Sequence, residues 1–245
     1  MAVAKKISDK VSSKAVPMEP VHVPVMWLKR MLVYGAGMFL LAMGVSFSIK
    51  SNLGVSPMNS LPYVISRVAG VDMGLVTTLV FSSYVVLQIF LLGRTFHLKN
   101  LLQVVVASLF GSFLSLTNRL LTIPAPIAYP IQILFLGISL VLIGAGIMLY
   151  MTGDLVPQPP EGLVMALAKK TGWSFSKVKV FFDCTVVTAA ILISIFSGNG
   201  MMGVREGTLI AAVGIGKVIG WMSGWFRPAL LTFCYGRGYN AKEIQ

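Results

Sequence analysis

Residues 44–70 read GVSFSIKSNLGVSPMNSLPYVISRVAG, and residues 146–172 repeat the pattern without a gap as GIMLYMTGDLVPQPPEGLVMALAKKTG. In both copies an apolar helix gives way to a polar turn, a short segment begins at proline, and a second apolar helix follows. Five aligned pairs are identical, where about two are expected by chance: Gly44/Gly146, Leu53/Leu155, Pro57/Pro159, Leu61/Leu163 and Gly70/Gly172. Duplicated helices that are interrupted at matching places indicate a transporter-like architecture with its site at the repeat interface, although they do not identify a cargo.

The composition is that of a polytopic membrane protein, because 56% of the 245 residues are hydrophobic, 11% are charged, and the mean hydropathy is +0.83. Six stretches approach the roughly 20 apolar residues that cross a bilayer, and they lie at 31–49, 73–93, 101–117, 131–151, 178–196 and 207–226. We therefore expect an all-α fold with six transmembrane helices. The predicted domains are a disordered cytoplasmic tail (1–26), a first transmembrane repeat (27–128), a second transmembrane repeat (129–228) and a cytoplasmic C-terminal tail (229–245).

The net charge of +12 is distributed unevenly along the chain. If the N-terminus is cytoplasmic and the chain crosses six times, most Lys and Arg residues fall inside. The exceptions are four external residues, Lys50, Arg67, Arg119 and Arg205, and one residue within a span, Lys217. This bias follows the positive-inside rule and predicts that both termini are cytoplasmic. The basic excess then serves topology and contact with anionic lipid in the bilayer, and we expect no nucleic-acid partner.

Residues 57–70 and 159–172 decide between two topologies. If both also crossed the membrane, the chain would have eight spans and parallel repeats. The excess of Lys and Arg on the cytoplasmic side would then be the same as with six spans. Fourteen helical residues rise only about 21 Å, however, and these segments carry charges such as Arg67, Glu161 and Lys169. Because they are too short and too polar to cross lipid, we interpret them as re-entrant or interfacial half-helices. The two three-span repeats are then inverted.

Proline marks the start of both half-helices, at Pro57 in the first copy and at Pro159 and Pro160 in the second. A helix start inside a membrane exposes unpaired N–H groups and a partial positive charge, which can bind an anion or a carboxylate. In inverted repeats two such ends can face each other near the midplane and form a binding site. The alternative is a helix–turn–helix corner in which the prolines only set the chain direction.

Glu161 directly follows the second proline. It is interpreted as a helix cap, as an acid that couples protons or cations to transport, or as a binder of a substrate amine. Its counterpart in the first copy is Asn59, so the duplicated site is asymmetric in charge. Asn52 and Asp154 align in the turns that precede the half-helices, where they are either candidates for binding or turn-forming residues.

Two ionisable residues, Asp183 and Lys217, lie inside predicted spans, where a charge is costly and is usually paired or functional. Both lie in the cytoplasmic half of their helices, and a Lys side chain can extend toward the interface. An ion pair between Asp183 and Lys217 is therefore feasible if their helices touch. It would act either as a structural tie or as part of a gate.

The sixth span carries Gly216, Gly220 and Gly224 at the four-residue spacing that lets helices pack closely. This spacing favours internal packing or a homodimer interface over ligand binding. Arg205 and Glu206 open the same span. Glu206 suits a helix start, whereas Arg205, one of the few external cations, is a candidate for collecting an anionic solute.

An enzymatic function is not expected. The sequence has no Gly-rich phosphate loop and no cluster of His, Cys and carboxylate residues for a metal. Its two cysteines, Cys184 and Cys234, lack the spaced partners of a metal site. We predict no catalytic residue, no metal and no cofactor.

Four stretches carry a family resemblance: LGVSP (53–57), EGL (161–163), VKVFFD (178–183) and GVREGTL (203–209). They resemble the YczE/YyaS/YitT group of bacterial integral membrane proteins over residues 30–230, and the last stretch is the most specific. The resemblance implies a polytopic protein of the bacterial inner (plasma) membrane and no particular substrate. The stretch VPQPP at 156–160 departs from the group by its richness in proline.

The leading hypothesis is a secondary transporter or exporter of a small polar or anionic solute, working by alternating access between the two halves. Two other classes also fit the sequence. One is a non-transporting scaffold or regulator of a neighbouring membrane protein, and the other is a solute-capturing subunit of an ATP-driven importer.

Overall fold

The computed structural model describes residues 23–198, 200 and 202–236, and this part of the chain is helical without strands. The elements are α2 (Val23–Ser51), α3 (Pro57–Ala69), α4 (Met73–Leu92), the short 3-10 helices η1 (Gly93–Thr95) and η2 (Leu98–Leu101), α5 (Leu102–Leu120), α6 (Tyr129–Gly153), α7 (Pro159–Thr171), α8 (Phe175–Phe196) and α9 (Glu206–Tyr235). Six helices are long and apolar enough to cross a membrane, namely α2, α4, α5, α6, α8 and α9. The predicted all-α polytopic fold is confirmed.

The first and last spans are longer than predicted. Helix α2 begins at Val23, inside the predicted tail, and α9 continues to Tyr235, beyond the predicted span end at residue 226. Helix α9 passes through Pro228 because its last turns pack against other helices. The Lys29 ammonium lies 5.1 Å from the centre of the Phe233 ring, and the Tyr235 hydroxyl donates to the Thr152 carbonyl oxygen at 3.4 Å. The rest of both predicted tails, 1–22 and 237–245, lies outside the described residues.

Helices α2 and α6 form the central contact of the molecule and cross with closely approaching backbones. A Cβ atom on Gly44 would lie 2.8 Å from the Ile143 backbone nitrogen, and a Cβ atom on Gly146 would lie 2.5 Å from the Leu41 backbone nitrogen. Small residues at these positions therefore permit the approach. The two contacts are equivalent in the repeat, because Gly44 aligns with Gly146 and, in the same register, Leu41 aligns with Ile143.

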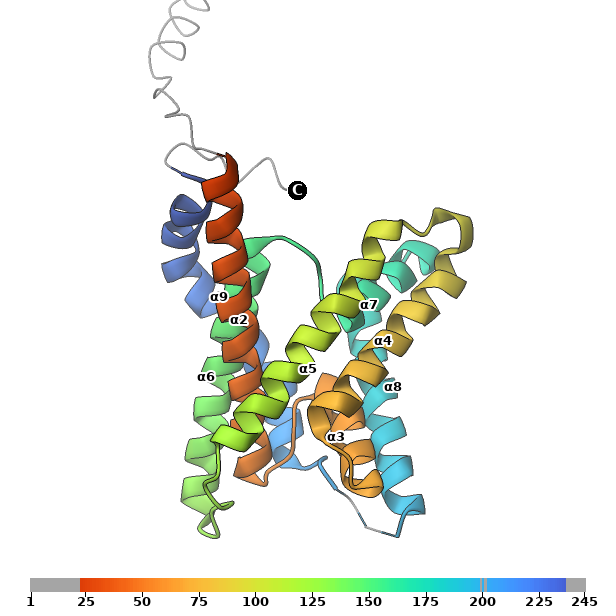
Figure 1. Ribbon diagram of the computed structural model, residues 1–245. Helices are drawn as coiled ribbons and strands as arrows, with labels where there is room; N and C mark the ends of the chain where they lie inside the picture. The colour runs from red at the N-terminus through yellow and green to blue at the C-terminus, as the bar shows by residue number, and fades with distance from the viewer. Residues whose placement is uncertain (1–22, 199, 201, 237–245) are drawn as a thin grey trace, which may run out of the picture.

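The half-helices α3 and α7 lie toward opposite ends of the molecule (Figure 1). We call the end that holds the start of α2 and the end of α9 the terminal end, at the top of Figure 1, and the opposite one the far end. Each half-helix has 13 residues, a rise of about 20 Å, which is too short to cross the bilayer. Helix α3 packs mainly on α8, and α7 packs mainly on α4. The half-helix of each copy therefore packs against a long helix of the other copy.

The outer helices of the two copies pack differently. Helices α4 and α5 are in close contact, where Gly74 and Gly111 approach so closely that a Cβ atom on either would clash with the other's backbone. The equivalent helices α8 and α9 scarcely touch each other. Helix α9 packs on α6 along one face and leaves the rest of its surface exposed. The two copies therefore have related sequences but unequal packing.

Candidate functional site

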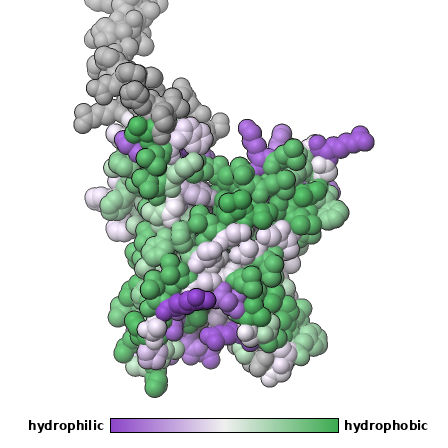
Figure 2. All heavy atoms as spheres, in the orientation of Figure 1, coloured by the Kyte–Doolittle hydropathy of each residue, from purple (hydrophilic) through white to green (hydrophobic). Residues whose placement is uncertain are grey.

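A pocket of about 390 Å³ opens at the far end between the two copies. The first copy contributes the end of α2, the turn after it and one face of α3, and the second copy contributes the segment before α9. Its lining residues are Ser48, Ile49, Asn52, Gly54, Val55, Tyr63, Arg67, Met202, Gly203 and Arg205. Figure 2 shows hydrophilic residues gathered in the hollow between the two lower lobes, with hydrophobic surface on both sides.

Backbone hydrogen bonds join the turn of the first copy to the start of α9. The Val55 N–H donates to the Gly203 carbonyl oxygen at 2.9 Å, and the Gly207 N–H donates to the Leu53 carbonyl oxygen at 2.8 Å. Gly54 lies between these contacts at a φ of +109°, where a side chain is strained, and a Cβ atom there would lie 2.8 Å from the Arg205 backbone nitrogen. Glycine at this position lets the two segments meet and form the pocket wall.

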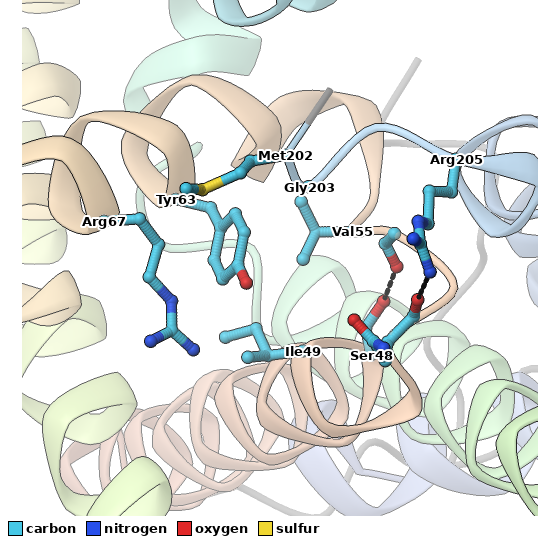
Figure 3. A pocket seen from close by; sticks show the side chains of 10 residues that line it. Ser48, Ile49, Val55, Tyr63, Arg67, Met202, Gly203 and Arg205 are labelled. Atoms are coloured by element: carbon cyan, nitrogen blue, oxygen red, sulfur yellow. Dashed lines mark hydrogen bonds between the residues drawn. The ribbon is translucent and has the colours of Figure 1, made fainter. Parts of the chain in front are cut away.

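Two arginines bring positive charge to the pocket (Figure 3). Arg205 donates from Nη1 to the Asn52 carbonyl oxygen at 2.9 Å. Arg67 extends from α3 with its guanidinium carbon 5.4 Å from the centre of the Tyr63 ring. No acidic residue lines the pocket, and the ion pairs found in the described part of the chain involve neither arginine. The pocket therefore has the chemistry of an anion site, since guanidinium groups pair readily with carboxylate or phosphate oxygens.

The turn at Asp154 lies at the terminal end and aligns with the turn at Asn52, but different contacts close it. Asp154 ends α6 in the left-handed region at φ +46°, as Asn52 does after α2 at φ +57°. The Arg30 guanidinium, whose side chain is 11% exposed, donates to the Gly153 carbonyl oxygen at 2.9 Å and also to that of Asp154. The Asp154 carboxylate lies 4.0 Å from the same arginine. Both aligned residues therefore form turns, and the second turn is closed by an arginine of the first copy.

Glu161 stands in the first turn of α7 and is partly buried. Its carboxylate lies beside the Tyr150 hydroxyl of α6 and within electrostatic reach of the Lys179 ammonium of α8. Enclosure by surrounding atoms raises the pKa of the Glu161 carboxyl above its usual range. The hydroxyl, the ammonium and the Gln158 backbone N–H act in the opposite direction.

The predicted ion pair between Asp183 and Lys217 is wrong. The Asp183 carboxylate instead pairs with the Lys179 ammonium of its own helix at 2.6 Å, one turn away. Lys217 is exposed on α9, and α9 scarcely touches α8. The pairing fails because these two helices are not packing partners.

The remaining candidates are placed as follows. Pro57 and Pro160 are buried in the first turns of α3 and α7, but these half-helices pack mainly on other helices and not on each other. Asn59 is buried, with its amide nitrogen donating to the Ser56 hydroxyl at 2.9 Å. Glu206 is exposed in the first turn of α9 and does not line the pocket.

The glycine series of α9, comprising Gly216, Gly220 and Gly224, faces open space, because a Cβ atom at each would meet nothing within 4 Å. The series does not serve internal packing in the described part of the chain. A homodimer through these glycines stays a prediction.

Sequence reasoning missed several residues that surround the candidates. Arg67 and Tyr63 line the pocket, and Arg30 closes the turn at Asp154. One signal could have found Arg67, which is one of the few external cations and lies in a half-helix next to the candidate turn. The position of Arg30 in α2 gives no such signal.

The fold and the pocket define a multi-pass α-helical membrane protein with a polar pocket built by both copies of a repeat. The chain belongs to a family of unknown function, DUF6198, whose family model matches residues 28–224.

Similar proteins are found in two bacteria. The uncharacterized membrane protein YczE of Bacillus subtilis (strain 168) is 29% identical over 193 residues, which cover 78% of this chain and 83% of YczE. The uncharacterized protein YyaS of that strain is 24% identical over 180 residues, covering 73% and 85%. An uncharacterized protein of Haemophilus influenzae is 28% identical over 180 residues, covering 74% and 77%. The expected likeness to the YczE/YyaS group is confirmed. No solved structure matches the chain.

Proposed function

We propose that this protein is a secondary transporter of a small anionic solute in the bacterial inner membrane. The observation that carries the proposal is the far-end pocket, in which Arg67 of the first copy and Arg205 of the second lie without an acidic residue in the lining. Two guanidinium groups facing a pocket of this size suit a solute with a carboxylate, phosphate or similar anionic group. A site shared by two repeats is the arrangement that secondary transporters use.

The pocket opens to the outside of the cell in this proposal. Lys50, Arg67, Arg119 and Arg205 lie at the far end, whereas the segments with more cations, such as 94–99 and 169–179, lie at the terminal end. The positive-inside rule then assigns the terminal end to the cytoplasm. An anionic solute would first meet Arg67 and Arg205 from the exterior.

Alternating access would come from inversion of the two copies. The proposal is supported by equivalent backbone contacts at the crossing of α2 and α6, and by the exchange of half-helices, in which α3 packs on α8 and α7 packs on α4. Arg30 closes the turn at Asp154, whereas the matching turn at Asn52 lines an open pocket. Rocking of one copy against the other would close the pocket and open the cytoplasmic turn.

Counterflow in proteoliposomes tests the proposal. Purified protein is reconstituted with one unlabelled anion inside, and uptake of the same labelled anion is measured for a panel of monocarboxylates, dicarboxylates, phosphate and sulfate. We expect at least one anion to exchange far above the rate in empty liposomes. Neutral and cationic analogues of that anion should not exchange. A protein that moves no member of the panel, but binds a neighbouring protein in the same membrane, would instead be the scaffold or regulator.

A further inference from the structure

A second pocket, of about 330 Å³, lies at the terminal end between α6 and α9. Helix α9 contributes Ile219, Ser223, Arg227 and Leu231, whose four-residue spacing places them along one face of the helix. Both walls of the pocket belong to the second copy of the repeat. The pocket therefore lies outside the interface between the copies and is separate from the far-end pocket.

The acidic and the basic residue of this pocket lie at a similar depth in the molecule. Helices α6 and α9 run in the same direction, from the far end to the terminal end (Figure 1). They meet at Gly144, where a Cβ atom would lie 2.5 Å from Cγ1 of Val218. Asp154 follows Gly144 by ten residues, and Arg227 follows Val218 by nine. Because both helices rise equally per residue, Asp154 and Arg227 line the pocket at nearly the same level.

Both charged groups are available to a ligand. Arg227 is exposed, and the ion pairs and side-chain hydrogen bonds found in the described part of the chain do not include it. The Asp154 side chain is 58% exposed, and its carboxylate lies 4.0 Å from Arg30, beyond the length of a direct hydrogen bond. The pocket thus offers one guanidinium and one carboxylate to the same ligand.

Apolar side chains extend the pocket toward the membrane centre. Met148 and Ile219 precede the charged residue of their own wall by six and eight residues, so they lie deeper. Two tryptophans of α9, Trp221 and Trp225, are 65% and 75% exposed. Exposed tryptophans of membrane proteins gather at the level of the lipid headgroups. The pocket therefore lies at the boundary between headgroups and acyl chains.

We propose that this pocket binds phosphatidylethanolamine, a phospholipid whose headgroup carries a phosphate and a terminal ammonium. The Arg227 guanidinium would pair with the phosphate, and the Asp154 carboxylate would accept hydrogen bonds from the ammonium. Met148 and Ile219 would contact the start of an acyl chain. Basic pockets between transmembrane helices bind lipid headgroups in other proteins. This site does not depend on the transport function proposed above.

The carboxylate selects among phospholipids. Phosphatidylglycerol also carries a phosphate for Arg227, but it has no cation to balance Asp154. Native mass spectrometry of the purified full-length protein gives the apparent Kd of each lipid added to detergent micelles. We expect the wild type to bind phosphatidylethanolamine several-fold more tightly than phosphatidylglycerol with the same acyl chains.

Two arginine variants test the phosphate contact. Arg227→Gln should weaken phosphatidylethanolamine binding by about tenfold or more, because it removes a charge-assisted contact. Arg94→Gln removes an exposed cation at the same end of the molecule but outside the pocket lining, so it should leave binding unchanged.

Two further variants test the rest of the pocket. Asp154→Asn should abolish the preference between the two lipids, and the turn should survive because the aligned Asn52 adopts the same left-handed conformation at φ +57°. Ser223→Leu keeps both charges but fills part of the pocket, so it should weaken the binding of both lipids.

Each outcome decides the proposal. Equal affinity of the wild type for the two lipids would overturn it, and so would unchanged phosphatidylethanolamine binding in Arg227→Gln. If Arg227→Gln does not fold, Asp154→Asn and Ser223→Leu carry the test. Glycerophosphoethanolamine has the same headgroup without acyl chains, and competition by it at the lipid's own concentration would overturn the lipid in favour of a soluble solute. Because binding is scored without transport, a failure of anion exchange would leave this site standing.

Discussion

The Arg205 guanidinium donates a hydrogen bond of 2.9 Å to the Asn52 carbonyl oxygen, which joins the second copy of the repeat to the turn that follows α2 in the first. Arg30 joins the copies in the opposite direction, because it lies on α2 of the first copy and donates to the carbonyl oxygens of Gly153 and Asp154 in the second. Arg205 is exposed at the pocket, whereas Arg30 is largely buried. We infer that each arginine holds one end of the interface between the copies. Arg205 lies at the open end, which contains the far-end pocket, and Arg30 lies at the closed end.

The close crossing of α2 and α6 predicts a large cost for one added methyl group. Gly146→Ala would place its Cβ atom 2.5 Å from the Leu41 backbone nitrogen, which cannot move without shifting α2. We expect a loss of about 2 kcal/mol in the free energy of unfolding. Gly137→Ala in the same helix is the matched control, because its Cβ atom meets nothing within 4 Å. The control should be neutral or slightly stabilising in a thermal unfolding assay in detergent.

The six-span topology predicts which loops an impermeant thiol reagent can reach. In a variant that lacks Cys184 and Cys234, a cysteine at His97 should be shielded from reagent added outside intact cells, and a cysteine at Ala125 should react. Both positions are exposed in the structure, so accessibility reports the side of the membrane. The reverse pattern would contradict six spans, because eight spans place the two loops on the opposite sides.

The ion pair of Lys179 and Asp183 predicts coupling along α8 and none across to α9. A double-mutant cycle with Lys179→Gln and Asp183→Asn should give a coupling free energy of about 0.5 kcal/mol, as for partly exposed pairs one turn apart. Lys217→Gln combined with Asp183→Asn should give additive losses. Coupling between Asp183 and Lys217 in this cycle would mean that α8 and α9 meet after all.

The raised pKa of Glu161 predicts how stability depends on pH. A carboxyl group with a raised pKa in the folded state binds its proton more tightly there than in the unfolded chain. Its contribution to stability is therefore full at low pH and is lost as pH rises through the raised pKa. In potassium buffer the wild-type Tm should fall between pH 5.5 and 8, a window set about neutrality, more than that of Glu161→Gln. Equal curves for both proteins would contradict the raised pKa of Glu161.

The spans and half-helices were predictable because length and hydropathy set them locally, and Pro57 and Pro159 mark the starts of both half-helices. The candidate site was less accessible, because it depends on which helices touch. Asp183 and Lys217 lie on helices that scarcely touch, whereas Arg67 and Arg205 line one pocket from positions far apart in the chain. The end of α9 was missed because Arg227 and Pro228 suggest a boundary that packing on α2 and α6 overrides.

The central claim is that Arg67 binds an anionic solute during transport. The most direct measurement is the concentration dependence of anion uptake by proteoliposomes that contain wild-type protein, Arg67→Gln or Arg119→Gln. Arg119 is the matched control, since it is an exposed far-end cation outside the pocket lining. Loss of a charge-assisted contact worth about 1.5–3 kcal/mol predicts that Arg67→Gln raises the KM at least tenfold, while Arg119→Gln leaves it unchanged. Equal KM values for all three proteins would contradict the account.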